Sequence, residues 1–189
     1  SILLSANPLP NAAGWHNADV TVTSICSGGA GAVTCPAPLT VSSEGADQLI
    51  TRIATDSAGN TASASLTLRL DKTPPLVAIS SPDNNASSVN PLATFTGTVS
   101  DALSGLASVT CNGAIATLAA GGFTCGVTLA LGPNTVTVLA RDTAGNTATS
   151  TLSLTLSPPL TIRFSAPTNL SYLNLSPTTV SGTVSDPAA

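Results

Sequence analysis

The stretch Asp56-Ser57-Ala58-Gly59-Asn60-Thr61 returns later in the chain as Asp142-Thr143-Ala144-Gly145-Asn146-Thr147. Each copy is followed by an alternating run of Thr, Ser, Ala and Leu, and then by a pair of prolines. A second repeat, Gly97-Thr98-Val99-Ser100-Asp101, recurs as Gly182-Thr183-Val184-Ser185-Asp186, at nearly the same spacing. Two independent repeats at one spacing indicate a tandem array. The period of about 85 residues is close to the length of one small β-sandwich.

The composition favours strands and turns over helices. The 189-residue chain has no Met, only 7% charged residues, and a single Glu and a single Lys. Thr, Ser, Val, Ala, Gly and Pro fill the chain, and they suit short strands and tight turns. Aromatic residues make up only 3%, so each core must be built from Val, Leu, Ile and Ala.

Charge and hydropathy exclude some classes of partner. A net charge of −4 argues against binding to nucleic acid or to an anionic membrane surface, because either would favour a basic patch. No uninterrupted apolar run approaches the ~20 residues that a membrane-spanning helix needs. The chain starts without Met or a signal peptide, so we expect either a mature chain or a piece of a longer one.

Four cysteines form two short-range pairs, Cys26 with Cys35 and Cys111 with Cys125. Neither pair has the spacing or the His partners of a zinc site. We expect two disulfides, each adding about 2–3 kcal/mol by closing a short loop, and therefore an oxidising, extracellular or cell-surface setting. The alternative is two pairs of buried free thiols.

The alternating pattern predicts an all-β chain of three units, at residues 1–73, 74–157 and 158–189. The Asp-x-Ala-Gly-Asn stretches are expected to form hairpins, because Gly and Asn tolerate the positive φ that tight turns require. In the first unit we expect strands at 19–26, 33–41, 48–55 and 61–70. In the second we expect strands at 76–80, 92–101, 106–112, 123–131, 134–141 and 147–156.

Residues 14–75 resemble bacterial Ig-like repeat domains of large secreted and cell-surface proteins. The strings that carry this resemblance are Gly-Trp-His-Asn-Ala-Asp-Val-Thr-Val-Thr, Ser-Glu-Gly-Ala, Ala-Thr-Asp-Ser-Ala-Gly-Asn-Thr-Ala and Asp-Lys-Thr-Pro-Pro. Residues 76–157 resemble a related family of all-β accessory modules found in adhesins and secreted polysaccharide hydrolases. The strings here are Ser-Pro, Gly-Thr-Val-Ser-Asp, Ser-Gly and Leu-Gly-Pro-Asn-Thr-Val-Thr.

The resemblance implies tandem Ig-like Greek-key β-sandwiches, the third of them incomplete. It does not extend to the antibody-type hallmark of a Trp packed on an inter-sheet disulfide. Trp15 lies in a loop-like stretch, and the cysteine spacing predicts that neither pair bridges the two sheets.

Enzymatic chemistry has little support in the sequence. His16 is the lone histidine, and a Ser-His-Asp site would have to use it. A solvated surface-loop residue is the simpler interpretation of His16. Glu44 is expected to pair with Asp47 or to fix its own turn. We therefore expect no enzyme and no catalytic residues.

Three aspartates of the second unit are candidates for a metal site. In an Ig-like sandwich Asp71, Asp101 and Asp142 all fall at the end that faces the preceding unit. Three carboxylates meeting there would suit Ca²⁺, which prefers oxygen ligands, and calcium stiffens the joints of related adhesin arrays. The alternative is that each Asp only hydrogen-bonds its own turn.

These observations predict a structural segment of an extracellular or surface protein, either a stalk or a filament-forming array. Its partners would be neighbouring Ig-like domains of the same or adjacent chains, with a homopolymer as one form. The incomplete third unit is explained by a fragment of a longer chain or by strands donated from another subunit. The alternative function is a carbohydrate- or cell-binding module, such as an accessory of a polysaccharide-degrading enzyme.

Overall fold

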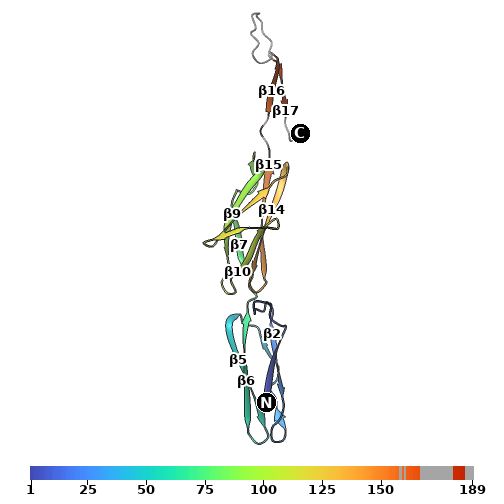
Figure 1. The fold of residues 1–189 in the computed structure, drawn as a ribbon, viewed down its shortest axis with the longest axis vertical. Coiled ribbons are helices and arrows are strands. Elements are labelled where there is room, and N and C mark those ends of the chain that lie inside the picture. The colour runs from blue at the N-terminus through green and yellow to red at the C-terminus, as the bar shows by residue number, and fades with distance from the viewer. Residues whose placement is uncertain (158, 160, 167–180, 186–189) are drawn as a thin grey trace, which may run out of the picture.

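The computed structural model describes residues 1–157, 159, 161–166 and 181–185. It is all-β, with two sandwiches placed end to end and a two-stranded hairpin beyond them (Figure 1). No helix in the described residues is long and apolar enough to cross a membrane. This architecture confirms the predicted fold class of tandem Ig-like β-sandwiches.

The first sandwich packs two three-stranded sheets, in the orders β1-β2-β4 and β3-β5-β6. Along β2 the buried side chains alternate with more exposed ones, which is the period of a strand with one face in a core. That core is entirely aliphatic and is built from Val20, Val22, Val41, Leu68 and Leu70. The strands are β1 Ile2–Asn7, β2 Val20–Cys26, β3 Val33–Thr34, β4 Leu39–Val41, β5 Gly45–Asp56 and β6 Thr61–Leu70.

The prediction of one strand over 33–41 is wrong. Val33–Thr34 pairs with β5 in one sheet, whereas Leu39–Val41 pairs with β2 in the other. The segment between them contains Pro36 and Pro38, which cannot donate main-chain hydrogen bonds to a ladder. The chain therefore leaves one sheet at the prolines and joins the other.

The second sandwich is larger and pairs a four-stranded sheet, β12-β13-β9-β7, with a five-stranded sheet, β11-β10-β14-β15-β8. Phe95 is fully buried in its core. The strands are β7 Leu76–Ser81, β8 Ala86–Ser88, β9 Leu92–Ser100, β10 Leu106–Cys111, β11 Ala114–Ile115, β12 Thr117–Ala119, β13 Gly122–Thr128, β14 Gly132–Asp142 and β15 Thr147–Leu156.

Gly97, in the repeated Gly-Thr-Val-Ser-Asp motif, lies where β7, β9 and β13 pack closely. A Cβ atom there would overlap the carbonyl oxygen of Ala78 and the ring of Phe123. The glycine is therefore required by close approach of a neighbouring strand and of a core aromatic ring.

Both predicted disulfides are present, Cys26–Cys35 and Cys111–Cys125. The expectation that neither would bridge the sheets is wrong. Cys111 ends β10 of the five-stranded sheet, and Cys125 lies in β13 of the four-stranded sheet. In the first sandwich Cys26 ends β2, and Cys35 directly follows β3 of the opposite sheet. A short sequence separation spans both sheets because successive strands of a Greek key cross between layers.

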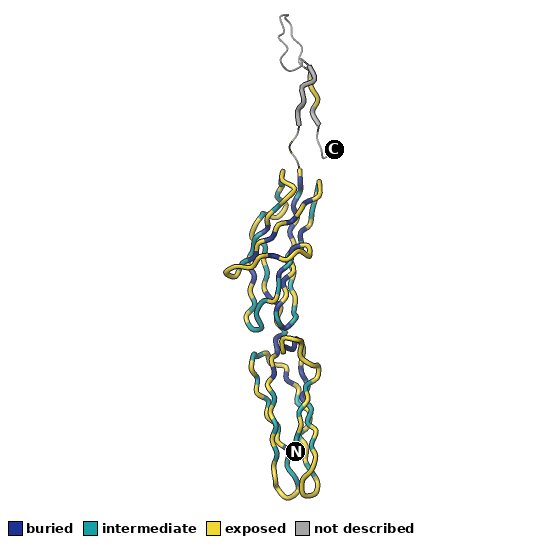
Figure 2. Tube along the Cα trace, in the orientation of Figure 1, coloured by how far each residue is buried: buried dark blue, intermediate teal, exposed yellow. Residues whose placement is uncertain are grey.

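Beyond the second sandwich, β16 Thr161–Ala166 pairs antiparallel with β17 Ser181–Ser185. Apart from Pro159, the rest of the third unit predicted at 158–189 lies outside the described residues. Figure 2 shows that buried positions line the inside of both sandwiches and continue into the segment that connects them.

Candidate functional site

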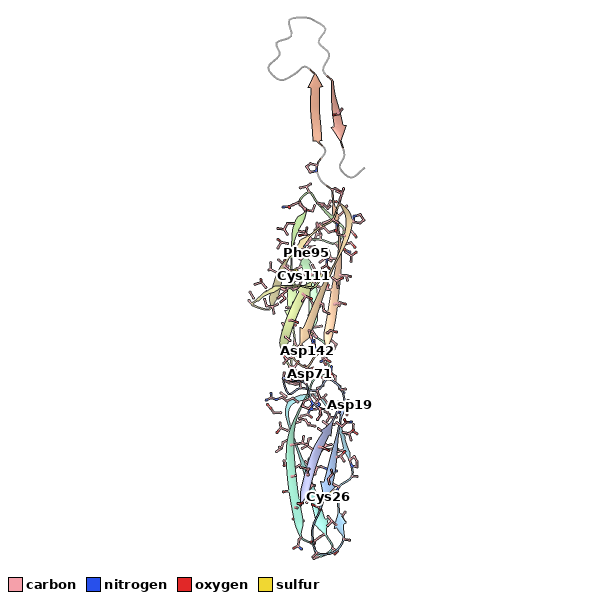
Figure 3. The ribbon with its side chains drawn as sticks, turned by 45° about the vertical axis from the view of Figure 1, so that its right-hand side comes forward. Asp19, Cys26, Asp71, Phe95, Cys111 and Asp142 are labelled. Carbon is pink, nitrogen blue, oxygen red and sulfur yellow. A yellow bond between two sulfur atoms is a disulfide. The ribbon has the colours of Figure 1, made fainter. Side chains whose placement is uncertain are left out.

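The three aspartates predicted to form a metal site lie together where the two sandwiches meet. We call this region the joint, and it comprises residues 71–75, 101–105 and 142–147. One carboxylate oxygen from each of Asp71, Asp101 and Asp142 lies within 4.8 Å of the others. Asp71 and Asp142 are fully buried, at 0% and 1% exposure, and Asp101 is half-buried. Figure 3 shows Asp71 and Asp142 next to each other at the junction.

Three different elements bring these side chains together. Asp71 directly follows β6, the last strand of the first sandwich. Its main-chain N–H donates to the carbonyl oxygen of His16 at 3.0 Å, which ties the start of the linker to the first sandwich. Asp101 directly follows β9 and Asp142 ends β14. The linker thus enters the second sandwich between a loop and a hairpin that each present an aspartate.

Each carboxylate accepts hydrogen bonds from its own turn, as the alternative interpretation predicted. Asp142 Oδ1 accepts from the N–H groups of Gly145 and Asn146 at 2.6 and 2.7 Å. Asp101 Oδ1 accepts from the Gly105 N–H at 2.6 Å. These bonds fix the orientation of the carboxylates, and they leave further lone pairs on the oxygens for another donor or a cation.

Asp71 also accepts a bond from the second sandwich. Its Oδ1 accepts from the Thr73 N–H at 3.1 Å, and its Oδ2 accepts from the Ser104 N–H at 3.0 Å. The first carboxylate of the cluster is therefore already held by the loop that carries the second.

None of the three joint carboxylates forms an ion pair within the described residues. The two ion pairs found there are Arg69–Asp47 and Lys72–Asp19, and neither includes a joint carboxylate. Three carboxylates at close range, two of them out of contact with water, disfavour one another electrostatically. The arrangement therefore favours any bound positive charge, and oxygen-only ligands are the type that Ca²⁺ takes.

Two asparagine side chains add hydrogen bonds between the sandwiches. Asn11 Nδ2 donates to the carbonyl oxygens of Thr143 and Ala144, at 2.8 and 3.1 Å. Asn146 Nδ2 donates to Asp142 Oδ2 at 2.8 Å and to the carbonyl oxygen of Asp71 at 2.9 Å. Hydrogen bonds thus cross the joint in both directions.

Glu44 holds the linker rather than pairing with Asp47. Its Oε1 accepts from the Lys72 N–H at 2.6 Å and from the Thr73 hydroxyl at 3.0 Å. Lys72 Nζ reaches back to Asp19 Oδ1 and to the carbonyl oxygen of Ser42, both at 2.8 Å. Asp47 instead pairs with Arg69. We call these contacts of Glu44 and Lys72 the linker clamp. The sequence analysis did not predict it, although the chain's single Glu lies beside a turn and its single Lys lies in the linker.

His16 is not the solvated loop residue that we expected. It is only 4% exposed, and its Nδ1 has no hydrogen-bond partner in the structure. Burial lowers the pKa of His16, because it disfavours the charged imidazolium. Its main chain forms a parallel bridge with Leu70, so the loop that carries His16 packs along the end of β6.

The first copy of the hairpin motif has a different environment at the far end of the first sandwich. Hydrogen bonds from the Asn60 side chain, and then from the Ala30 N–H, lower the pKa of Asp56 to about 2. Where the second sandwich has Asp101, the first has Ser27, which accepts from the Ser1 amino group at 2.6 Å. The three-carboxylate cluster is therefore a property of the joint rather than of the hairpin motif.

The second sandwich matches a family model. Residues 75–157 match the family described as glucodextranase, domain B. This match, with the sandwich topology, confirms the resemblance of the chain to bacterial Ig-like repeat domains. No curated protein sequence gives a significant match to the chain.

Several solved structures align with the chain at low identity. The fibronectin(III)-like modules of Clostridium thermocellum CbhA are 13% identical, with a TM-score of 0.41, over 82% of this chain and 94% of that one. A titin I-band fragment is 17% identical, with a TM-score of 0.48, over 84% and 66%. A 1.5-MDa bacterial ice-binding adhesin is 19% identical, with a TM-score of 0.30, over 88% and 69%.

Proposed function

We propose that this chain is a stalk segment of an extracellular or surface protein, and that the joint holds its two sandwiches in a fixed end-to-end arrangement. The observation that carries this proposal is the bonding of residues 71–73. Asp71 is bonded to His16 of the first sandwich and to Ser104 and Asn146 of the second. A flexible spacer would leave its linker solvated, whereas this linker starts with a fully buried residue.

We propose in addition that the joint binds Ca²⁺ through Asp71, Asp101 and Asp142. These carboxylates come from the linker, a loop and a hairpin, so a cation shared by all three would connect the linker to the body of the second sandwich. The ion would also neutralise charge on carboxylates that take part in neither described ion pair. Calcium sites of extracellular modules have dissociation constants of about 10⁻⁴ to 10⁻³ M, and we expect an affinity in that range.

An extracellular or surface location is supported by the two disulfides, because such bonds persist in oxidising compartments. An Ig-like fold is typical of non-catalytic modules, and we propose no enzymatic activity for this chain. Function on such folds resides in particular sites rather than in the fold itself, and the site described here is built to position domains.

A carbohydrate-binding module is the second candidate, because the family that matches the second sandwich is named for a domain of a glucodextranase. Sugar-binding sites of this kind usually present exposed aromatic rings. The aromatic side chains that the structure describes, Trp15, Phe95 and Phe123, are all buried. The described residues therefore favour the stalk over the glycan-binding alternative.

Calorimetric titration with CaCl₂ up to millimolar concentration tests the metal proposal. We expect saturable binding of one Ca²⁺ by the chain, and loss of that binding in Asp101→Asn. Asp101 is chosen because it is only half-buried, so its substitution is the least disruptive of the three. Asp83→Asn removes an exposed carboxylate from the same sandwich and should leave binding unchanged. Equal binding by Asp101→Asn and the unsubstituted chain would refute the site.

A further inference from the structure

The two copies of the hairpin motif share hydrogen bonds between their Asp and Asn residues. The N–H of Asp56 donates to the carbonyl oxygen of Asn60 at 2.9 Å, and the N–H of Asp142 donates to that of Asn146 at 3.1 Å. The Asn side chain donates back to the Asp carboxylate in both, at 3.0 and 2.8 Å. The turns differ between these residues, because the Asp carboxylate accepts from the Ala58 N–H in the first and from the Gly145 N–H in the second. Both hairpins nevertheless orient the Asn amide by the same contact, and that amide and the carbonyl groups of the two residues after the Asp are the outward-facing groups compared below.

In the second sandwich these outward groups hold the preceding unit. The second N–H of the Asn146 amide donates to the carbonyl oxygen of Asp71. The carbonyl oxygens of Thr143 and Ala144 accept from the Asn11 amide. Ala144, at the tip of the hairpin, is only 3% exposed. The hairpin thus binds the end of the preceding Ig-like unit through one amide donor and two carbonyl acceptors.

In the first sandwich the corresponding groups have no partner within the described residues. The Asn60 amide donates only to Asp56, which leaves one of its two N–H groups unused. The carbonyl oxygens of Ser57 and Ala58 accept no hydrogen bond there, and residues 57–60 are all exposed. A recess of about 140 Å³ beside the hairpin is lined by Ser1, Gly28, Gly29, Asp56 and Asn60 among others.

We propose that the exposed hairpin of residues 56–61 is a docking surface for the linker end of another Ig-like unit of the first-sandwich type. Such a unit offers both complementary groups, namely a main-chain carbonyl at an Asp71-type position and an amide at an Asn11-type position. Ser1 lines the recess, which gives the linker of a docked unit a place to lie. This inference rests on the proposed stalk function, and it names the surface through which the array extends.

The contact that docking would form at the 56–61 hairpin, called the new contact, differs from the joint in one respect. Asp56 corresponds to Asp142, but Ser27 stands where the second sandwich has Asp101. Docking at this hairpin would bring together two carboxylates instead of three. Its stability therefore depends on the asparagine and carbonyl contacts.

A fusion protein tests the proposal with the whole chain retained. A second copy of residues 1–74, called the added sandwich, is placed ahead of Ser1. Ser1 then takes the position that Pro75 has before Leu76, so the linker keeps its length. Residual dipolar couplings measured by NMR in the presence of Ca²⁺ report whether neighbouring sandwiches share one alignment tensor. We expect a shared tensor across the new contact and shifted amide signals at residues 57–60 of the original first sandwich.

Asn11→Asp in the added sandwich is the decisive variant. It keeps the Oδ1 atom that accepts from Ala13 and Trp15, so the loop should remain folded. It also replaces the donating Nδ2 with an oxygen that faces two carbonyl oxygens. We expect the tensors to separate and the amide signals of residues 57–60 to return to their positions in the original chain. Asn7→Asp in the added sandwich adds the same charge at an exposed position of β1 and should change neither.

The original joint in the same molecule separates the two proposals. A shared tensor across the original joint but not across the new contact would overturn the docking surface and leave the stalk proposal standing. A shared tensor across the new contact that persists in Asn11→Asp would overturn the assigned hydrogen bonds. Separate tensors at both contacts would overturn both proposals.

Discussion

Removing the Cys111–Cys125 disulfide should destabilise the second sandwich more than removing Cys26–Cys35 destabilises the first. The two bridges close loops of similar length, with sequence separations of 14 and 9 residues. The chain-entropy model assigns them nearly equal contributions, about 3.0 and about 2.7 kcal/mol. A difference between the two must therefore come from the native state.

Burial supplies that difference. Cys111 and Cys125 are 1% and 6% exposed and belong to the core around Phe95, whereas Cys35 is exposed. Replacing each buried Cys with Ala leaves a small cavity that costs about 1 kcal/mol, comparable to losing a buried methyl group. We expect Cys111→Ala with Cys125→Ala to lose about 5 kcal/mol, and Cys26→Ala with Cys35→Ala to lose about 3 kcal/mol.

The assay is guanidinium unfolding followed by NMR signals assigned to each sandwich, which gives a free energy of unfolding for each. A loss of about 5 kcal/mol approaches the whole stability of a small domain. An unfolded second sandwich beside a folded first one is therefore also an expected result. Equal losses of stability in the two double variants, or a larger loss in the first sandwich, would show that burial of Cys111 and Cys125 does not add to the contribution of their disulfide.

Three further predictions concern single residues. The ionised Asp56 carboxylate, whose pKa is lowered from 3.8 to about 2, stabilises the first sandwich at pH values above 3.8, and this contribution should be lost as the pH falls toward about 2. Asp56→Asn should flatten this part of the stability–pH profile, and an unchanged profile would contradict the assignment. Gly97→Ala should cost about 3 kcal/mol by overpacking, whereas Gly126→Ala, whose added Cβ would meet its nearest neighbour at 3.7 Å, serves as the control in thermal unfolding. Glu44→Ala should speed hydrogen exchange of the Lys72 amide about tenfold or more by removing a charge-assisted bond, and Glu44→Gln, which retains an acceptor oxygen, should give an intermediate rate. Equal rates in the unsubstituted chain and in both variants would show that Glu44 does not hold the linker.

The strands were predictable where alternation and turn residues agreed. The strands at 61–70 and 147–156 follow directly from alternating Thr, Ser, Ala and Leu after a Gly-Asn turn, and they match β6 and β15. The turn chemistry was only half anticipated. Gly59 and Gly145 adopt positive φ, whereas the asparagines contribute through side-chain bonds to Asp56 and Asp142.

Features that depend on contacts between units were harder to predict. The convergence of Asp71, Asp101 and Asp142 followed from general Ig-like topology, because that topology specifies which loops share an end. The burial of His16 did not follow, because it depends on how a loop packs against β6 and the next sandwich. The linker clamp of Glu44 and the bonds of Asn11 were missed for the same reason, since single polar residues carry no periodic signal.

We propose that the joint holds the two sandwiches in one orientation and that Ca²⁺ strengthens it. Residual dipolar couplings of the chain, measured with CaCl₂ and again with EDTA, test this claim directly. We expect residues 1–73 and 76–157 to share one alignment tensor in calcium. The two tensors should diverge when the metal is removed or when Asp101→Asn is introduced. Two independent tensors in calcium would mean that the sandwiches reorient freely about the linker, and the joint would then not fix their arrangement.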